Sequence, residues 1–240
     1  MKGRPTDSGL LVAEGPHLVE ELFRSSWTPH TLVVTPEALP AWEVHARKAN
    51  LDTIVLPSRT FSTISSTETT QGVLALARPV EWTWKHMTRE HPLIVALDGL
   101  QDPGNAGTIV RSAEAFGATG IIFLAGCVRV ANVKLMRASS GSLFRLPLLE
   151  NVERDVLVST ARSNRLRVYS LSAGQGRVIS DVSWTEPCVI VVGSEGGGIS
   201  DTVSGAAEHV SIPMYQVESL NAGVACSIAL FEASRQRRLT

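Results

Sequence analysis

Two continuous apolar runs, each followed at once by a glycine-rich loop, constrain the fold of this chain more than any other feature. They occupy residues 93–97 (LIVAL) and 189–192 (VIVV). Such runs are typical of strands buried on both faces of a parallel sheet. A helix is expected over residues 108–116 and a strand over 120–124. The alternation of strand, loop and helix predicts an α/β domain with a parallel sheet over residues 93–240.

Short apolar segments and helical patterns also alternate through the first 80 residues. Strands are expected at residues 10–13, 32–34, 53–56 and 73–77, and helices at 17–25, 39–49 and 61–65. The alternation predicts a small α/β sandwich over residues 1–80. Prolines border the polar, aromatic run at residues 81–92, as expected of a linker. Trp82 and Trp84 in this run either cover a domain junction or stack on RNA bases.

The composition excludes several classes of protein. Of the 240 residues 44% are hydrophobic, enough for a sizeable core, and the net charge of −1 is not that of a basic nucleic-acid-binding protein. Any contact with nucleic acid must therefore come from local patches. The three cysteines lie far apart without a C-x-x-C pair, so no metal site or disulfide framework is expected. Without a signal-peptide core or an apolar stretch of about 20 residues, the chain is expected in the cytoplasm, with no membrane partner.

The loop after the first apolar run, residues 98–107, is rich in glycine but lacks both G-x-G-x-x-G and G-x-x-x-x-G-K-[ST]. The usual dinucleotide and P-loop fingerprints are therefore missing. Arg111 follows, and is expected in the first turn of the next helix, where the helix dipole disfavours a cation. Either Arg111 pairs with Asp98 or Asp102, or it faces a substrate. The sequence leaves both interpretations open.

The loop after the second apolar run contains three consecutive glycines at residues 196–198, preceded by Gly193, Ser194 and Glu195. Glycines after a strand indicate a close approach of the backbone to a ligand or to another chain segment. Among these glycines Glu195 has few apolar neighbours against which it could pack. Its carboxylate is suited to bind a ribose hydroxyl or a cation, or to organise the loop.

A third loop lies between a short strand ended by Pro213 and a helix expected over residues 224–238. Ser219 is the expected N-cap of this helix, because its hydroxyl is able to accept from unpaired amides of the first turn. The expected apolar face contains Val224, Ile228 and Phe231, with Leu230 as a further candidate. A loop of small polar residues before a helix N-terminus is suited to hold a polar ligand.

A basic segment at residues 129–145 combines four cations with small hydroxyl residues. Arginine, lysine and serine donors suit contacts with phosphate, so the segment is a candidate RNA-binding patch. The alternative is a solvated helix face. The four cations are Arg129, Lys134, Arg137 and Arg145.

The three loops together resemble the three motifs of the SpoU (TrmH-like) branch of the SPOUT methyltransferases, over residues 93–238. The residues that carry the likeness are Asn105, Gly107, Arg111 and Ser112, then Gly193, Ser194, Glu195, Gly196 and Gly198, then Ile212, Pro213, Met214, Ser219, Leu220 and Asn221. Residues 12–20 and 70–75 resemble an L30e-like substrate-binding domain. The resemblance implies an RNA ribose 2'-O-methyltransferase that uses S-adenosylmethionine. It also implies a deep trefoil knot, and a homodimer whose catalytic residues meet across the subunit interface.

The resemblance also implies roles for individual residues. The cofactor would contact residues of the second and third loops, namely Gly193, Ser194, Glu195, Gly196, Ile212, Met214, Leu220, Asn221 and Ala222. The catalytic residues would be Arg111, Asn105, Glu195 and Ser219. Arg111 would position the 2'-hydroxyl and stabilise developing negative charge, because a guanidinium holds its protons too tightly to act as a base. Asn105 would fix the loop or the ribose, and Glu195 and Ser219 would orient Arg111 and the substrate.

One position departs from the pattern of some family members. They carry a second serine two residues after the asparagine of the third motif, where this chain has Gly223. Any role of that serine is therefore absent or has moved to Ser227, one turn later.

Among RNA substrates, the N-terminal unit and the short tail after residue 238 favour ribosomal RNA, 23S in particular, over transfer RNA. A non-catalytic RNA-binding or ribosome-assembly protein with the same fold is a second reading, which the intact motif residues oppose. A nucleotide-dependent enzyme with a doubly wound sheet is a third, which the missing phosphate fingerprints oppose.

Overall fold

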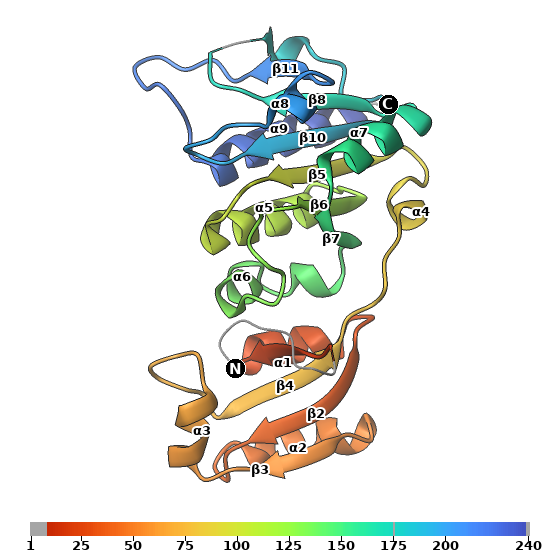
Figure 1. Ribbon diagram of the computed structural model, residues 1–240. Coiled ribbons are helices and arrows are strands. Elements are labelled where there is room, and N and C mark those ends of the chain that lie inside the picture. The colour runs from red at the N-terminus through yellow and green to blue at the C-terminus, as the bar shows by residue number, and fades with distance from the viewer. Residues whose placement is uncertain (1–8, 175, 239–240) are drawn as a thin grey trace. The chain divides into compact units, whose positions relative to one another are not determined.

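The chain forms two compact units, shown in Figure 1 as a computed structural model that describes residues 9–174 and 176–238. The first unit contains the chain up to residue 81 together with residues 129–145. The second contains residues 82–128 and the chain from residue 146 onward. The basic segment 129–145 thus interrupts the second unit in sequence and packs within the first.

The first unit is built on a four-stranded sheet with the order β1-β4-β2-β3. Its strands are β1 (Leu11–Glu14), β2 (Thr28–Val34), β3 (Asp52–Val55) and β4 (Val73–Arg78). β4 lies antiparallel to both β1 and β2, whereas β3 is parallel to β2. The helices are α1 (Pro16–Phe23), α2 (Leu39–Lys48) and α3 (Ser58–Ile64). The predicted small α/β unit is confirmed, although α3 begins three residues earlier than expected, directly after Pro57.

The basic segment contributes α6 (Val133–Ala138) and a short 3₁₀ helix, η1 (Ser142–Phe144), to the first unit. Phe144 is buried and meets Trp27 edge to face, with ring centroids 5.0 Å apart. Gly141 has a φ of +90°, and a Cβ there would lie 2.7 Å from the Cβ of Glu21. Only glycine satisfies both conditions. The segment is therefore an integral part of the packing of this unit.

The second unit contains a seven-stranded sheet with the order β7-β6-β5-β10-β8-β11-β9, in which every pairing is parallel. The strands are β5 (Leu93–Asp98), β6 (Gly120–Leu124), β7 (Leu148–Val152), β8 (Arg167–Leu171), β9 (Arg177–Val178), β10 (Cys188–Gly193) and β11 (Glu208–Ser211). The two apolar runs form the adjacent central strands β5 and β10, as predicted. Their register places Asp98 opposite Gly193, so the loops that follow them start side by side.

Helices cover both faces of this sheet (Figure 1). On one face, α5 (Pro103–Ala115) packs against α9 (Ala222–Arg237), and on the other lie α7 (Arg154–Ser163) and α8 (Asp201–Ser204). A short helix, α4 (Trp84–Met87), and a 3₁₀ helix, η2 (Ile179–Asp181), complete the unit. Trp84 packs against the core formed by buried residues of β5, β6, α7, β10 and α8.

Helix α5 begins five residues before its predicted start. The side chain of Asp102 caps it by accepting from the backbone N–H of Asn105 at 2.6 Å, and Pro103 occupies its first turn. Arg111 therefore lies about two turns into the helix, and the prediction of a first-turn position was wrong. The helix dipole acts within the terminal turn, so it does not disfavour the positive charge of Arg111 at this position.

Two predictions for the last helix were also wrong. The N-cap of α9 is Asn221, whose Oδ1 accepts from the N–H groups of Gly223 (3.0 Å) and Val224 (3.2 Å), so Ser219 is not the cap. The buried face consists mainly of small residues, namely Ala222, Gly223, Cys226, Ala229, Leu230, Ala233 and Ser234. Small side chains let α9 approach α5 closely.

The larger apolar residues of α9 form an exposed stripe instead. Val224, Ile228 and Phe231 are 46%, 36% and 56% exposed, and their spacing places them on one side of the helix. The ring of Phe116, at the end of α5, meets that of Phe231 at 5.8 Å between centroids. Among the residues described here, no helix is both long and apolar enough to cross a bilayer.

Candidate active site

Three loops of the second unit meet at the carboxyl edge of its sheet, and three side chains join them. The Nδ2 of Asn105 donates to Oε1 of Glu195 at 2.8 Å. The Nδ2 of Asn221 donates to Oδ1 of Asn105 at 2.8 Å and to Oε1 of Glu195 at 3.1 Å. These residues follow β5, β10 and β11 respectively. The structure thus brings together one residue from each of the three predicted motifs.

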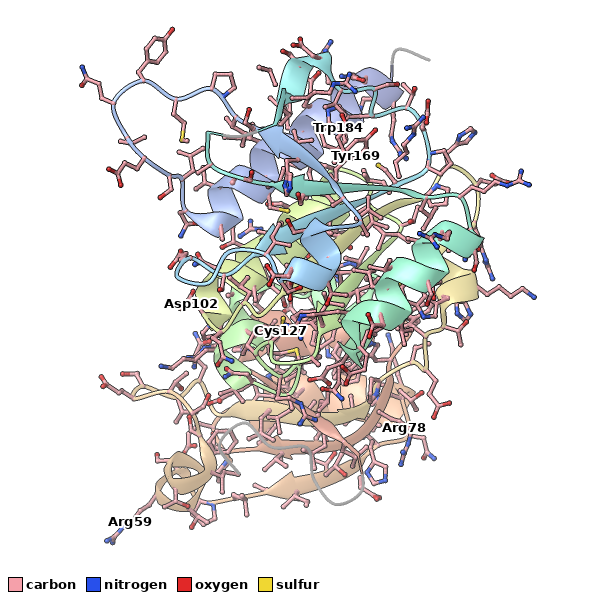
Figure 2. All side chains as sticks on the ribbon, turned by 45° about the horizontal axis from the view of Figure 1, so that its top comes forward. Arg59, Arg78, Asp102, Cys127, Tyr169 and Trp184 are labelled. Atoms are coloured by element: carbon pink, nitrogen blue, oxygen red, sulfur yellow. The ribbon has the colours of Figure 1, made fainter. Side chains whose placement is uncertain are left out.

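Contacts with the backbone fix the orientation of this network. Asn221 uses its Oδ1 to cap α9, which leaves its Nδ2 to point at Asn105 and Glu195. The backbone N–H of Asn105 is bound by Asp102, which Figure 2 labels at this edge of the sheet. The starts of α5 and α9 are therefore both tied to the loop that carries Glu195.

The glycine loop after β10 folds back on itself. Ser194 and Gly198 exchange two backbone hydrogen bonds, of 3.0 and 2.9 Å, and the Oγ of Ser194 accepts from Gly197 N at 3.1 Å. A Cβ at Gly193 would lie 2.2 Å from the carbonyl oxygen of Gly198, so a side chain is excluded there. The close approach predicted for these glycines occurs within the loop itself. At Gly196 an added Cβ would meet nothing within 4 Å.

A cavity of about 390 Å³ opens between the loops after β8, β10 and β11. Its wall includes seven of the nine residues predicted to contact a cofactor: Gly193, Ser194, Glu195, Ile212, Met214, Leu220 and Ala222. Ser219 also lines it, whereas Gly196 and Asn221 do not. The volume falls within the range of about 300–1,000 Å³ typical of small-molecule sites. Ser194 and Glu195 give the wall polar groups, and Met214 and Leu220 give it apolar groups. The cavity therefore suits a ligand that has both polar and apolar parts.

Sequence reasoning missed part of the cavity wall. Leu171 at the end of β8, the two residues after it and His209 of β11 line it as well. The ring of His209 is held by hydroxyls, with Nδ1 2.7 Å from Ser170 Oγ and Nε2 3.3 Å from Ser204 Oγ. The only available signal was that β8 is another parallel strand, whose carboxyl end must reach the same edge.

Arg111 is exposed on α5 and has no side-chain hydrogen bond or ion pair within residues 9–174 and 176–238. The two carboxylates suggested as structural partners are used elsewhere: Asp98 binds Arg154, and Asp102 caps α5. Glu195 and Ser219, predicted to orient Arg111, do not contact it through hydrogen bonds in this part of the chain. The guanidinium is therefore available to a substrate.

Ser227 lies at the contact between α5 and α9. Its Oγ donates to the carbonyl oxygen of Gly223 at 2.7 Å and lies 2.7 Å from the Oγ of Ser112, the neighbour of Arg111. A Cβ at Gly223 would lie 3.3 Å from the Cγ2 of Thr108, so a serine would fit there only tightly. Ser227 thus supplies a hydroxyl beside the helix that carries Arg111.

The four cations of the basic segment have different surroundings in the first unit. Arg145 forms an ion pair with Glu21, and Arg137 donates to the Oγ of Ser66 at 3.3 Å. Lys134 and Arg129 are exposed. Part of the predicted RNA-binding patch therefore also holds the first unit together.

The cysteines give no sign of a metal site or a nucleophile. Burial raises the pKa of the Cys188 thiol to about 11, and burial also raises the pKa values of Cys226 and Cys127. The three thiols are therefore protonated at neutral pH. No group of three His, Cys, Asp or Glu side chains in the described ranges is arranged to hold a metal ion.

Comparisons with known proteins agree with this geometry. Residues 92–231 match the SpoU rRNA Methylase family. The chain belongs to this family. Residues 2–75 match the MRM3-like substrate binding domain. An uncharacterized tRNA/rRNA methyltransferase of Synechocystis is 30% identical over 98% of this chain and 87% of its own length.

Solved structures of SpoU proteins match both units. The SpoU methyltransferase AviRb from Streptomyces viridochromogenes, in complex with S-adenosylmethionine, is 27% identical, with a TM-score of 0.88 over 96% of this chain and 91% of its own. An RNA 2'-O ribose methyltransferase, also 27% identical, has a TM-score of 0.79 over 96% of this chain and 90% of its own. The present chain is therefore an RNA methyltransferase with the SPOUT α/β fold, and its cofactor is S-adenosylmethionine.

Asn105→Asp tests the loop network. The substitution would place a second carboxylate where the Nδ2 of Asn105 now lies 2.8 Å from Glu195. We expect weaker binding of S-adenosylhomocysteine at pH 8, by about fivefold, which is about 1 kcal/mol for a partly solvated charge pair. Isothermal titration calorimetry measures the effect, and Asn105→Ala, which adds no charge, is the control and should lose less affinity. Equal losses of affinity in the two variants would contradict a repulsion between residue 105 and Glu195.

Proposed function

We propose that this protein transfers a methyl group from S-adenosylmethionine to a ribose 2'-hydroxyl of 23S ribosomal RNA. The observation that carries the proposal is the joining of the three motif loops by Asn105, Glu195 and Asn221 at the edge that holds the cavity. Arg111 lies on the helix that starts at this network, and its side chain has no partner among the described residues. The SpoU membership and the similarity to an RNA 2'-O ribose methyltransferase support the reaction type.

The cofactor-binding residues that we propose are those of the second and third loops. They are Gly193, Ser194, Glu195, Gly196, Ile212, Met214, Leu220, Asn221 and Ala222. Bound S-adenosylmethionine supplies a methyl group on a sulfonium with a neutral leaving group. The chain must therefore align the 2'-oxygen with this methyl group and stabilise the oxygen as it loses its proton.

We assign stabilisation of the 2'-oxygen to Arg111. A guanidinium has five N–H donors and no acceptor, so Arg111 acts by donating to the 2'-oxygen and to a neighbouring phosphate and not as a base. Asn105, at the start of the same helix, fixes α5 relative to the cofactor loop through Glu195. Ser219, in the cavity wall, would contact the substrate or the cofactor.

The two units have different proposed tasks. Residues 1–80 would form the RNA substrate-binding domain, 81–92 the linker and 93–240 the methyltransferase domain. The match of residues 2–75 to a substrate-binding domain supports this division. The description of the family as rRNA methylases supports ribosomal RNA, whereas the tRNA/rRNA name of the cyanobacterial relative leaves transfer RNA as the alternative. The proposed location is the cytoplasm, the compartment that holds ribosomes. The trefoil knot of SPOUT proteins stays a prediction for this chain.

The exposed stripe on α9 supports a homodimer. Val224, Ile228 and Phe231 would lose contact with water if a second copy covered them, and each buried side chain of this size contributes about 1.5–3 kcal/mol. The stripe lies on the helix that packs against α5, which carries Arg111. A partner at this face would therefore lie close to the proposed catalytic arginine.

The decisive experiment is to map 2'-O-methylation on ribosomal and transfer RNA from cells with and without the protein. A ribosomal site that loses its methyl group supports the proposal, and loss at a transfer RNA site assigns the alternative substrate. Transfer of labelled methyl groups to RNA by the purified protein tests catalysis directly. Failure of transfer to any RNA would favour a non-catalytic RNA-binding protein.

Arg111→Ala should lower turnover by about 10²–10³-fold, the loss typical of removing one donor to a developing oxyanion. Affinity for S-adenosylhomocysteine and the Tm should stay unchanged, since the side chain has no partner in the described structure. Single-turnover kinetics and calorimetry measure the two effects. Arg111→Lys, which keeps the charge but not the planar guanidinium with its several N–H donors, should regain part of the rate. Loss of cofactor binding in Arg111→Ala would mean that its role is structural.

Lys134→Glu should weaken RNA binding and reduce the slope of log affinity against log salt by about 1, because one phosphate contact is lost. Filter binding at several salt concentrations measures both quantities. Lys48→Glu is a matched control, since Lys48 is an exposed lysine of α2 in the same unit. An unchanged affinity and salt slope in Lys134→Glu would remove Lys134 from the RNA-binding surface.

Phe231→Asp should convert a dimer to a monomer in sedimentation velocity, because a charge in a dry interface lacks a partner. Val156→Asp, at an exposed apolar position of α7, is the control and should leave the mass unchanged. A dimer that survives Phe231→Asp would show that the α9 stripe is not the interface.

A further inference from the structure

A buried carboxylate lies at the carboxyl end of β5, beneath the glycine loop. Asp98 is 2% exposed, and both of its oxygens are fully engaged. Oδ1 accepts from Arg154 Nε at 2.9 Å and Nη2 at 2.8 Å. Oδ2 accepts from Ser200, from its backbone N–H at 2.9 Å and from its Oγ at 2.6 Å. Four donors satisfy the roughly four acceptor sites of a carboxylate.

An ionised side chain in this position is expensive for the fold. The five residues of β5 that precede Asp98 are apolar and buried, and an apolar residue would continue the strand without desolvating a charge. Paired charges in protein interiors are often no more stabilising than apolar residues of similar volume. The residues that Asp98 binds, Arg154 and Ser200, therefore indicate its role better than stability does.

Asp98 lies beside the start of the cofactor loop and holds the end of the loop through its side chain. Gly193, where the loop begins, lies opposite Asp98 in the β5–β10 register. Ser200, where the loop ends and α8 begins, donates twice to Asp98. Between these points Ser194 and Gly198 are bound to each other. Only the tip of the loop, with Glu195, then projects toward the asparagines.

Arg154 extends this anchor to the helical layer. It is the first residue of α7 and is about one-third exposed, so its charge is partly removed from water. The buried residues Leu157 and Ala161 of α7 share a core with Val203 of α8, which follows Ser200. The guanidinium thus neutralises Asp98 and links the loop to the packed pair of α7 and α8.

We propose that Asp98 is a positioning residue for the S-adenosylmethionine loop, which it holds through Ser200 in its binding conformation before the cofactor arrives. The inference rests on the assignment of the cavity to the cofactor. A loop that is already ordered loses little conformational entropy on binding, so the anchor raises affinity without touching the ligand. It also sets the place of Glu195 relative to Asn105 and Asn221.

The test uses Ser200, because Asp98→Asn would leave Arg154 without its counter-charge and risk misfolding. Ser200→Ala removes one charge-assisted hydrogen bond and keeps the backbone bond. Affinity for S-adenosylhomocysteine should fall about tenfold, the range for a hydrogen bond to a charged group. In the ligand-free protein, amide hydrogen exchange at Ser194 and Gly198 should become faster, and the Tm should fall modestly because the lost bond also stabilises the folded protein. Ser200→Thr, which keeps the hydroxyl, should restore both properties.

The control is Ser159→Ala on α7, which removes an exposed hydroxyl bonded only to the carbonyl oxygen of Val156. If Ser200→Ala lowers the Tm but leaves affinity and exchange unchanged, Asp98 has only a structural role and the proposal is wrong. Faster exchange with unchanged affinity also overturns it, because the order of the loop would then not matter for binding. The exchange measurement requires neither cofactor nor RNA, so its result is independent of which RNA is methylated.

Discussion

The carboxylate of Glu195, held by the amides of Asn105 and Asn221, is the interaction on which the rest of the active site depends. It joins residues 90 and 26 positions apart in sequence, and the two asparagines, 116 positions apart, bind each other. Its partners are neutral donors and not cations. The loops are therefore assembled without using Arg111, which has no hydrogen-bonded side-chain partner within the described residues.

The parallel sheet makes this assembly possible. Because every pairing in the second unit is parallel, the loops after β5, β8, β10 and β11 all emerge at one edge, and those after β8, β10 and β11 line one cavity. Asn221 then performs two tasks, since its Oδ1 caps α9 and its Nδ2 completes the network. The start of the last helix is thereby fixed to the loop that carries Glu195. At the end of that loop, Ser200 donates to the buried carboxylate of Asp98.

The packing of α9 separates its apolar residues into small ones that are buried and larger ones that are exposed. The alanines and glycine of α9 are buried, and Val224, Ile228 and Phe231 remain exposed. The basic segment shows a comparable division of tasks. Arg137 and Arg145 contact residues of the first unit, whereas Lys134 is exposed. In both cases a feature that looks uniform in sequence is divided between residues that pack within the unit and residues that are exposed.

The sequence by itself determined the central strands β5 and β10, the α/β class of the fold, the family and seven of the residues that line the cavity. These follow from continuous apolar runs and from motifs whose residues lie within about ten positions of one another. The tertiary structure decided that Arg111 lies inside α5, that Asn221 and not Ser219 caps α9, and that α9 buries its small residues. It also decided that Asp98 pairs with Arg154 and Ser200. Periodicity identifies an amphipathic helix but not the neighbour that it faces, and pairs 56 and 102 positions apart are settled only when the sheet places them together.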